Sequence, residues 1–479
     1  MTENGLVSNH SSQECVVTCL GSQGVQVHAN CARLTRHAAV FEVYGPSSTL
    51  LASEVLNEFK ISLRGRTVFS GKAVVKKLVS TGLVEVCEAE LGEGWLDFDG
   101  FAALADKGRL SEEFRNYIAG WQKQQTVRPE FKLHIADMQI FFIELRQWLD
   151  QVEMGVRAAA ADNRADVERD ITAQLASSVI PTVDGLFEKF EMLAGTLEEE
   201  QRPLHRAYMK RQLHPLLLCS PFAHRTFTKP LGFAGDYEMV NMIWRNGHEG
   251  SSLFAKVVNC WFLEQPPARA HRNRIDYLVK RLFEETLRVR AQGRSARVFN
   301  LACGPALEVQ EFLRSSALSS ETEIALLDFN QETLDYTSAI LEDAKRRHAR
   351  STVLHFIKKS VHQILKESGK ASGRAAEVQY DFIYCAGLFD YLSDAVCQRL
   401  TTTLYRWLAP GGLLLLTNVD ACNPLRQGMD YLLDWSLIHR TTRQCLSALP
   451  GGASPDMMSV RADTTGVNLL IEVRKPEHA

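Results

Sequence analysis

The sequence of 479 residues has no apolar run near 18 residues long and no basic start followed by an apolar stretch. The first absence argues against a membrane-spanning helix, and the second argues against a secretory leader. The eleven cysteines form no CxxC pair and no spacing typical of metal ligands. We therefore expect a reduced, cytoplasmic protein with no membrane span, no disulfides and no bound metal.

An excess of charge of either sign is also absent. The formal net charge is -3, with 23% charged and 45% hydrophobic residues. This balance gives no reason to expect nucleic acid as a partner, and it is ordinary for a globular protein with a large core. The length predicts about two to four domains.

The chain is organised around a short strand, a turn of small residues and a helix. Val298 to Leu301 is apolar around Asn300, Ala302 to Ala306 reads ACGPA, and Leu307 to Arg314 has helical spacing. Small residues in this place let the backbone approach a ligand closely at a helix N-terminus. In a doubly wound α/β sheet, ligands bind at this edge, where the strands have their carboxyl ends.

Three further apolar ladders follow the turn. Ile324 to Leu327 ends at Asp328, Tyr380 to Tyr384 comes next, and Leu413 to Thr417 follows a predicted turn at Ala409 to Gly412. An acidic residue about 20 residues beyond a glycine turn suits a ribose with both hydroxyls free. The second and third glycines of a dinucleotide fingerprint are missing, which argues against a nicotinamide dehydrogenase.

The order and spacing of these pieces resemble those of a class I S-adenosylmethionine (SAM) methyltransferase. We therefore predict a multidomain α/β protein with a Rossmann-like, doubly wound sheet and with SAM as cofactor. A Rossmann-like domain that holds no nucleotide is the alternative.

Residues from Val16 to about Leu91 form short alternating segments separated by turn signals. This rhythm predicts a small antiparallel barrel. The residues expected in its core are Phe41, Val43, Phe59, Ile61, Val68, Val74, Leu83, Val84 and Val86.

The barrel segment resembles a PilZ domain, a bacterial barrel that often binds cyclic di-GMP through an RxxxR pair and a D/NxSxxG turn. Here Arg33 and Arg36 are one residue too close, and Leu78 to Gly82 has neither the acidic or amide residue nor the glycine register. These departures argue against cyclic di-GMP, and a docking or dimerisation barrel is the preferred interpretation.

Helices are expected between the barrel and the sheet. Two apolar stripes, from Ile135 to Val152 and from Ile171 to Phe190, predict a hairpin with a turn at Ala158 to Asn163 and a kink at Pro181. This hairpin would link the two folded ends or hold a homodimer. Further on, the loop KPLGFAGDYEM precedes an apolar helix, either as a lid over the site or as a capping turn with Asp236 as N-cap. The predicted domains are 1–100, 101–202, 203–292 and 293–479.

Four motifs carry a more specific resemblance: KPLGFAGDYEM, RAHRNR, FNLACGPALEV and CAGLFDYLSD. Together they resemble a family of bacterial methyltransferases linked to biosynthesis of the extracellular factor 3-hydroxypalmitic acid methyl ester, a fatty-acid-derived quorum-sensing signal. The resemblance runs from about Arg202 to the C-terminus. Phe233 departs from the tyrosine expected in the first motif, so a hydroxyl contact is absent there.

The residues that we expect to bind the cofactor lie at the ends of the predicted strands. The turn should face the methionyl part of SAM, Asp328 the ribose and Phe329 the adenine, and the resemblance implies a contact of Ser360 and Val361 with the adenine edge. The expected cofactor-binding residues are Asn300, Ala302, Gly304, Pro305, Asp328, Phe329, Ser360, Val361, Cys385 and Gly387.

Tyr237 and Tyr391 are the predicted catalytic residues, in the sense that they would orient the acceptor. Arg245, Asn418 and Arg440 are weaker candidates, each with a structural alternative as a surface charge or a strand-end cap. An apolar tunnel for an acyl chain, or else ordinary core, is expected from Met239, Met242, Ile243, Trp244, Phe254, Tyr431, Leu432 and Trp435.

The hypothesis is a SAM-dependent O-methyltransferase that converts the carboxylate of a 3-hydroxy fatty acid into a methyl ester signal. One alternative keeps the enzyme and changes the acceptor to another small metabolite. A second is a regulatory protein whose barrel responds to a nucleotide and whose methyltransferase-like domain only binds a ligand or partner.

Overall fold

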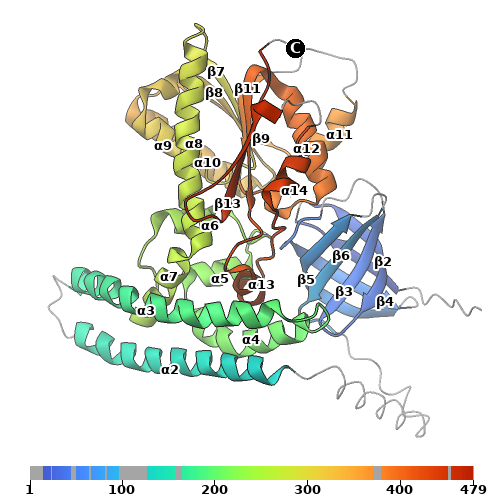
Figure 1. The fold of residues 1–479 in the computed structure, drawn as a ribbon, viewed down its shortest axis with the longest axis vertical. Coiled ribbons are helices and arrows are strands. Elements are labelled where there is room, and N and C mark those ends of the chain that lie inside the picture. The colour runs from blue at the N-terminus through green and yellow to red at the C-terminus, as the bar shows by residue number, and fades with distance from the viewer. Residues whose placement is uncertain are drawn as a thin grey trace, which may run out of the picture.

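The computed structural model describes residues 15–22, 24–44, 50–63, 66–80, 84–95, 127–157, 164–370, 379–450 and 455–477. The predicted turn at Ala158 to Asn163, Leu83 of the predicted barrel core, and the first part of the predicted helical region lie outside the described residues. A barrel, a group of long helices and a sheet with helices on both faces pack against one another (Figure 1). The predicted domain boundaries themselves stay predictions.

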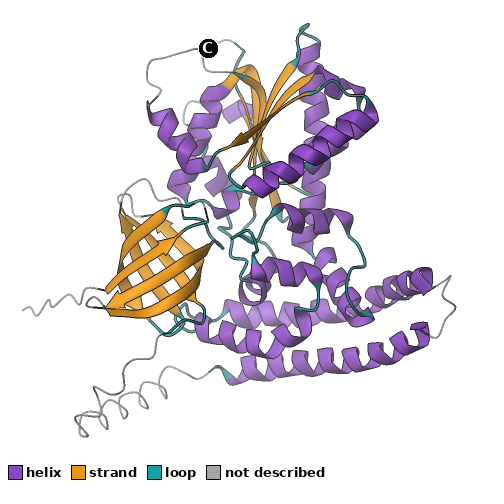
Figure 2. Cartoon of the chain, turned by 180° about the vertical axis from the view of Figure 1, so that it is seen from behind, coloured by secondary structure: helices purple, strands orange, loops and turns teal. Residues whose placement is uncertain are grey.

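The N-terminal part is a closed antiparallel barrel, as predicted, and its strands follow the order β1-β2-β3-β6-β5-β4 (Figure 2). Its resemblance to a PilZ domain stays a prediction. The strands are β1 (Cys15–Leu20), β2 (Gln26–Leu34), β3 (Ala38–Tyr44), β4 (Val55–Leu63), β5 (Arg66–Ser80) and β6 (Val84–Leu91).

The barrel core differs from the expected one in two strands. The predicted residues of β3 and β4, together with Val68, are buried, but Val74 and Val86 are only half-buried. The interior positions of β5 and β6 are taken by Ala73, Val75, Cys87 and Ala89. Alternation defines two faces of a strand but not which one is inside, so the prediction chose the wrong face in β6. In β5 it was right at Val68 and wrong at Val74, because the buried positions pass from Val68 and Phe69 to Ala73 and Val75 and so change face within the strand.

The helical region begins with a hairpin that extends to one side of the molecule (Figure 1). Its predicted stripe is confirmed, since Ile135, Met138, Phe142 and Leu149 are buried, and Pro181 lies within α3 without ending it. The helices are α2 (Pro129–Arg157), α3 (Arg164–Gly195), α4 (Arg202–Leu217), α5 (Pro221–Thr228), α6 (Tyr237–Arg245), α7 (Leu253–Glu264) and α8 (Pro266–Arg290). The predicted homodimer stays a prediction.

The C-terminal part confirms the doubly wound sheet. Its order is β12-β13-β11-β10-β7-β8-β9, with β13 antiparallel to its two neighbours and the remaining pairs parallel. This order places β7 next to β10, where the strand order reverses. The strands are β7 (Ala296–Leu301), β8 (Thr322–Asp328), β9 (Val353–Lys358), β10 (Tyr380–Cys385), β11 (Leu408–Val419), β12 (Met458–Ala462) and β13 (Asn468–Arg474).

Helices cover both faces of the sheet. Leu278 of α8, Phe312 and Leu334 belong to the core on one face, while Leu365 and Leu404 belong to the core on the other. The covering helices are α9 (Leu307–Ser315), α10 (Gln331–His348), α11 (Val361–Lys370) and α12 (Asp394–Trp407). In the described part of the chain, no helix combines the length and apolarity needed to cross a bilayer.

The predicted turn at Ala409 to Gly412 is corrected by the structure. These residues lie inside β11, whose pairing with β10 shifts register between Tyr380 and Phe382. The reason is local: Gly411 has φ of 73°, a conformation that lets a strand bulge and continue rather than reverse.

Candidate functional site

A cavity opens at the carboxyl ends of β7, β8 and β10, and it encloses about 1300 Å³ of empty space, counting its open mouth. Its walls include the ACGPA turn, the strand ends, the helices α6 and α8, the segment from Ala386 to Tyr391, Trp435, and Leu51 of the barrel. It lies where a doubly wound sheet binds its ligands, beside the point at which the strand order reverses.

The ACGPA turn borders this cavity in a left-handed backbone conformation. Ala302, Gly304 and Ala306 have φ of 56°, 51° and 49°. The Cys303 N–H donates to Leu327 O at 3.0 Å, and the Thr337 hydroxyl donates to Gly304 O at 2.7 Å. Because positive φ is costly for alanine, the surrounding hydrogen bonds must impose this shape. The expected contact surface for a ligand is therefore present and rigid.

Asp328 ends β8 at the cavity wall and is only 6% exposed. Its carboxylate accepts from the Gly304 N–H at 3.2 Å and from the Asn330 N–H at 3.0 Å. Burial raises the pKa of Asp328 to about 6, although these backbone donors oppose the shift. Each oxygen keeps a further lone pair, so the fixed carboxylate can accept from the two hydroxyls of a diol.

Beneath the turn, Glu308 in the first turn of α9 is buried between two donors. Asn300 Nδ2 donates to its Oε1 at 3.0 Å, and the Tyr384 hydroxyl donates to the same oxygen at 2.8 Å. Burial raises the pKa of Glu308. Asn300, a predicted cofactor residue, therefore orients this carboxyl while its own side chain lines the cavity.

Two residues of α8 present unused polar atoms to the cavity. Arg274 is 6% exposed and lies so close to Gly387 that a Cβ there would be 2.9 Å from its Nη1. No residue in the described part of the chain accepts a hydrogen bond from this guanidinium, which only faces the charges of Asp390 and Glu308. Burial lowers the pKa of Arg274, yet arginine stays charged in proteins.

His271 lies one turn before Arg274 on the same helix. Its Nδ1 is 2.8 Å from Pro267 O, so Nδ1 carries the proton. Burial and the neighbouring Arg274 lower the pKa of His271 to about 3, and the ring is neutral at pH 7. Its Nε2 is then a free acceptor, with no hydrogen-bonding partner among the residues that the structure describes.

Tyr391, predicted to orient the acceptor, lies in the cavity wall within the short turn η3 (Phe389–Tyr391). Its hydroxyl oxygen accepts from Trp435 Nε1 at 2.9 Å. Burial raises the pKa of Tyr391 well above its ordinary value, so the phenol is protonated. Its O–H has no acceptor in the described part of the chain and is available to a bound molecule.

Tyr237, the other predicted catalytic residue, lies at the rim where α6 approaches α10. Its hydroxyl donates to Glu332 Oε1 at 3.0 Å, and its ring stacks on Tyr336 with centroids 4.6 Å apart. Phe233 of the same loop contacts Phe329, with centroids 5.4 Å apart. Asp236 is also the N-cap of α6, accepting from the Met239 N–H at 2.8 Å. The loop is thus both a capping turn and a wall of the site.

The remaining predicted residues divide into two groups. Pro305, Val361 and Gly387 line the cavity, while Ser360 caps α11 and Cys385 is buried in β10, and neither of these two borders it. Of the weaker candidates, Arg245 forms ion pairs on the surface and Arg440 is buried against main-chain oxygens and Asn418. The contacts of Arg245, Arg440 and Asn418 are thus with other parts of the fold.

Sequence reasoning gave no role to Arg274, His271, Glu308, Asp390 and Leu51. A signal existed for the first two, because the RAHRNR motif puts a histidine and an arginine three residues apart on a predicted helix, where they share one face. Leu51 gave no signal at all, since the barrel lies far from the sheet in the sequence.

A second, apolar cavity adjoins the first and shares Trp435 with it. It encloses about 430 Å³ of empty space. Of the predicted tunnel residues, Ile243, Leu432 and Trp435 line this second cavity and Met239 lines the first, whereas Met242, Trp244, Phe254 and Tyr431 line neither.

No protein-family model and no curated protein matches the chain. Among solved structures, a possible exported protein from Bordetella parapertussis has a TM-score of 0.41 and 17% identity, covering 63% of this chain and 97% of its own. Magnesium protoporphyrin IX methyltransferase from Synechocystis PCC 6803, with bound S-adenosylhomocysteine (SAH), has a TM-score of 0.31 and 11% identity, covering 43% and 84%.

The N-methyltransferase NodS from Bradyrhizobium japonicum WM9, also in complex with SAH, has a TM-score of 0.30 and 14% identity, covering 50% of this chain and 98% of its own. At such low scores these likenesses carry no argument about activity. What the strand order described above shows by itself is a doubly wound, mostly parallel sheet.

Proposed function

We propose that this chain is a SAM-dependent O-methyltransferase that methylates the carboxylate of a 3-hydroxy fatty acid. The observation that carries the proposal is Arg274, a buried cation that faces the cavity with no hydrogen-bond acceptor among the described residues. A buried, unpaired charge is costly, and a carboxylate is the partner that a guanidinium binds best.

The ACGPA turn and Asp328 suit SAM. The turn offers backbone close to a ligand, and Asp328 is fixed by Gly304 and Asn330 to accept from two ribose hydroxyls. When bound, SAM would supply an activated methyl group. The residues of this chain would bind it, align it and exclude water from the reacting atoms.

A carboxylate acceptor needs no general base, because a carboxyl group with a pKa near 4–5 is already ionised at pH 7. One carboxylate oxygen would bond to the methyl carbon as the carbon–sulfur bond breaks and sulfur keeps the electron pair, so no proton moves. Arg274 would orient the carboxylate, and Nε2 of His271 would accept from a hydroxyl nearby on the acceptor. The apolar cavity beyond Trp435 suits an acyl chain.

Calorimetric titration with SAH, followed by 3-hydroxypalmitate, tests the proposal. We expect SAH to bind, and we expect Arg274→Gln to weaken the fatty acid at least tenfold while Arg269→Gln leaves it unchanged. Arg269 is the matched control, since it lies on the same helix but is 56% exposed and paired with Glu264. Loss of SAH binding in Arg274→Gln, with the fatty acid unaffected, would assign the guanidinium to the methionyl carboxylate instead.

Two alternatives predict different titrations. A methyltransferase for another small metabolite would bind SAH and ignore the fatty acid. A nucleotide-responsive regulator would bind cyclic di-GMP through the barrel and lose it when Arg33 and Arg36 are changed; Arg33 lies 3.8 Å from Glu200 in an exposed pair. The role of a methyl ester as a cell-density signal rests on the sequence resemblance alone.

A further inference from the structure

One residue of the cavity wall comes from the barrel. Leu51 follows β3 and precedes β4, yet it is 4% exposed and packs in the same apolar cluster as Met239, Tyr391 and Trp435. Its neighbour Leu50 is equally buried but packs in the core of the barrel itself. Of these two consecutive residues, Leu50 thus packs inside the barrel and Leu51 packs against the candidate site.

The residues after Leu51 are bonded to the elements that surround the acceptor end of the cavity. The Ala52 N–H donates to Tyr391 O at 3.0 Å, and the Val55 N–H donates to Gly232 O of the KPLGFAGDYEM loop at 2.8 Å. The Ser53 hydroxyl contacts Ser436 O at 2.8 Å and accepts from the Ser436 N–H. The loop after Leu51 is therefore bonded to the main chain of Tyr391 and to that of Ser436, the residue after Trp435.

Hydrogen bonds within the barrel fix the conformation of the loop from Leu51 to Glu54. Glu54 is 1% exposed and accepts from the Leu51 N–H at 2.7 Å and from the Ser22 hydroxyl at 2.7 Å. Ser53 has φ of 61° and donates its N–H to Val75 O at 2.8 Å. A serine in this conformation needs such support, so Leu51 has little freedom to leave the wall.

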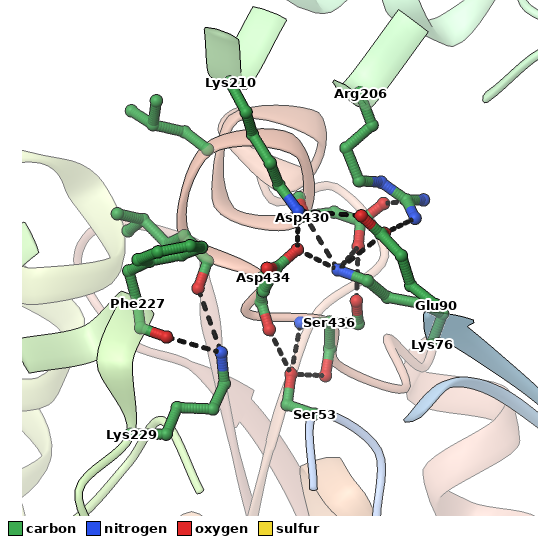
Figure 3. Close-up of polar contacts among 12 residues, drawn as sticks. Ser53, Lys76, Glu90, Arg206, Lys210, Phe227, Lys229, Asp430, Asp434 and Ser436 are labelled. Atoms are coloured by element: carbon green, nitrogen blue, oxygen red, sulfur yellow. Dashed lines mark hydrogen bonds and ion pairs between the residues drawn. The ribbon is translucent and has the colours of Figure 1, made fainter. Parts of the chain in front are cut away.

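A buried ionic network fastens the barrel to the helix that precedes Trp435 (Figure 3). Lys76 of the barrel is 2.6 Å from Asp434, at the end of α13 (Arg426–Leu433). Lys210 of α4 bridges Glu90 of the barrel at 2.8 Å and the same Asp434 at 2.6 Å. Two further pairs join Arg206 to Asp430 and to Glu90.

The network therefore links three parts of the molecule at one point. Its three cations and three carboxylates come from the barrel, from α4 and from α13, and the nearby cations hold the pKa of Asp434 and of Glu90 below their ordinary values. The next residue after Asp434 is Trp435, whose indole donates to Tyr391. The ionic network therefore couples the position of the barrel to the position of the cavity wall at Trp435 and Tyr391.

We propose that the barrel is an integral part of the acceptor site, in which Leu51 contacts the apolar part of the acceptor and sets which acceptors fit. This inference rests on the proposed function for its substrate class. It assigns to the barrel a direct role in specificity, whether or not the barrel binds a nucleotide.

Leu51→Trp and Leu51→Ala test the inference, with Leu50→Ala as the matched control from the same loop. The two probes are 3-hydroxy fatty acids of graded length and the apolar anionic dye 1-anilinonaphthalene-8-sulfonate. We expect Leu51→Trp to weaken both probes at least tenfold and Leu51→Ala to shift the preferred acyl length upward. SAH affinity should stay unchanged in all three variants, and Leu50→Ala should change thermal stability alone.

Equal probe affinities in wild type, Leu51→Trp and Leu50→Ala would overturn the inference, and so would a wild-type cavity that takes neither probe. Failure of the proposed function has a different signature, namely a wild-type protein that binds no SAH. A dye that responds to Leu51→Trp in such a protein would still support the role of Leu51 in the cavity.

Discussion

Single side chains decide the chemistry at the edge of the sheet. Asp328, Arg274 and His271 each line the cavity, the first from the end of β8 and the other two from α8. Their protonation follows from burial: the carboxyl of Asp328 is easier to protonate than usual, whereas the ring of His271 is harder to protonate. The site therefore offers an anion, a cation and a neutral acceptor near pH 7.

Asp328→Asn should weaken SAH binding by roughly 1.5–3 kcal/mol, the range of a hydrogen bond to a charged group. In the wild type, SAH affinity should also fall as the pH drops through about 6, since the pKa of Asp328 is raised to about 6 and the protonated form accepts less well. Calorimetry at several pH values measures both effects. Asp335→Asn, on the exposed face of α10, is the control; a pH dependence that survives in Asp328→Asn would contradict the assignment.

At the scale of elements, α13 matters more than its length suggests. It carries Asp430 and ends at its C-cap Asp434, which are two of the three carboxylates of the ionic network, and Trp435 is the next residue. Removing one charge from a buried network leaves its partner charges buried and unpaired. This lowers the free energy of unfolding more than the loss of an exposed ion pair does. Adjacent lysines of β5 provide this comparison within one strand.

Lys76→Met should lower the free energy of unfolding by about 3–5 kcal/mol, because the Lys76 side chain is 4% exposed and faces three carboxylates. Lys77→Met should lower the free energy of unfolding by about 1 kcal/mol or less, because the Lys77 side chain is 48% exposed and its ion pair with Glu199 is at the surface. Urea unfolding followed by circular dichroism gives both values. Similar losses for the two variants would show that the network adds little.

The buried Lys229 should make the stability of the protein depend on pH. It is buried with its Nζ 3.2 Å from Leu433 O, and burial lowers its pKa to about 7. Between pH 7 and the ordinary lysine value near 10.5, the unfolded chain binds a proton that the folded chain does not. Stability should therefore rise with pH across this window, by at most about 1.4 kcal/mol per pH unit. Lys229→Met should flatten that part of the stability profile, and an unchanged slope would contradict the prediction.

On the scale of the whole molecule, a buried junction joins the barrel to the sheet domain. The barrel packs beside the sheet domain in both views (Figures 1 and 2), and the junction contains buried charges, main-chain hydrogen bonds and a residue of the cavity wall. Domains joined by exposed linkers unfold separately, whereas a buried junction of this kind couples them.

Differential scanning calorimetry should accordingly record a single unfolding transition for the intact chain. In Lys76→Met the junction loses its central cation, and we expect the transition to broaden or to divide in two. SAH should raise the midpoint of the whole wild-type transition, because binding to the folded state stabilises whatever unfolds with it. Two separate wild-type transitions, with SAH shifting only one, would show that the barrel is an independent domain.

The sequence by itself determined the barrel, the helical hairpin, the doubly wound sheet and the position of Asp328 after β8. These depend on periods of apolar residues and on turn chemistry, which are local properties. It failed at the inside face of β6 and of the second half of β5, and at the bulge in β11, because these features depend on which neighbours each strand meets.

Only the tertiary structure decided which remote residues complete the site. Arg274 and Leu51 come from a helix and a barrel loop that are far apart in the sequence, and they line the same cavity because the elements that carry them pack together. The roles of both residues depend on their surroundings: Arg274 lacks a hydrogen-bond acceptor among the described residues, and Leu51 packs outside the core of its own barrel. The residue pattern of one segment does not contain those surroundings, so the sequence predicted Tyr391 but not Arg274 or Leu51 on the acceptor side of the site.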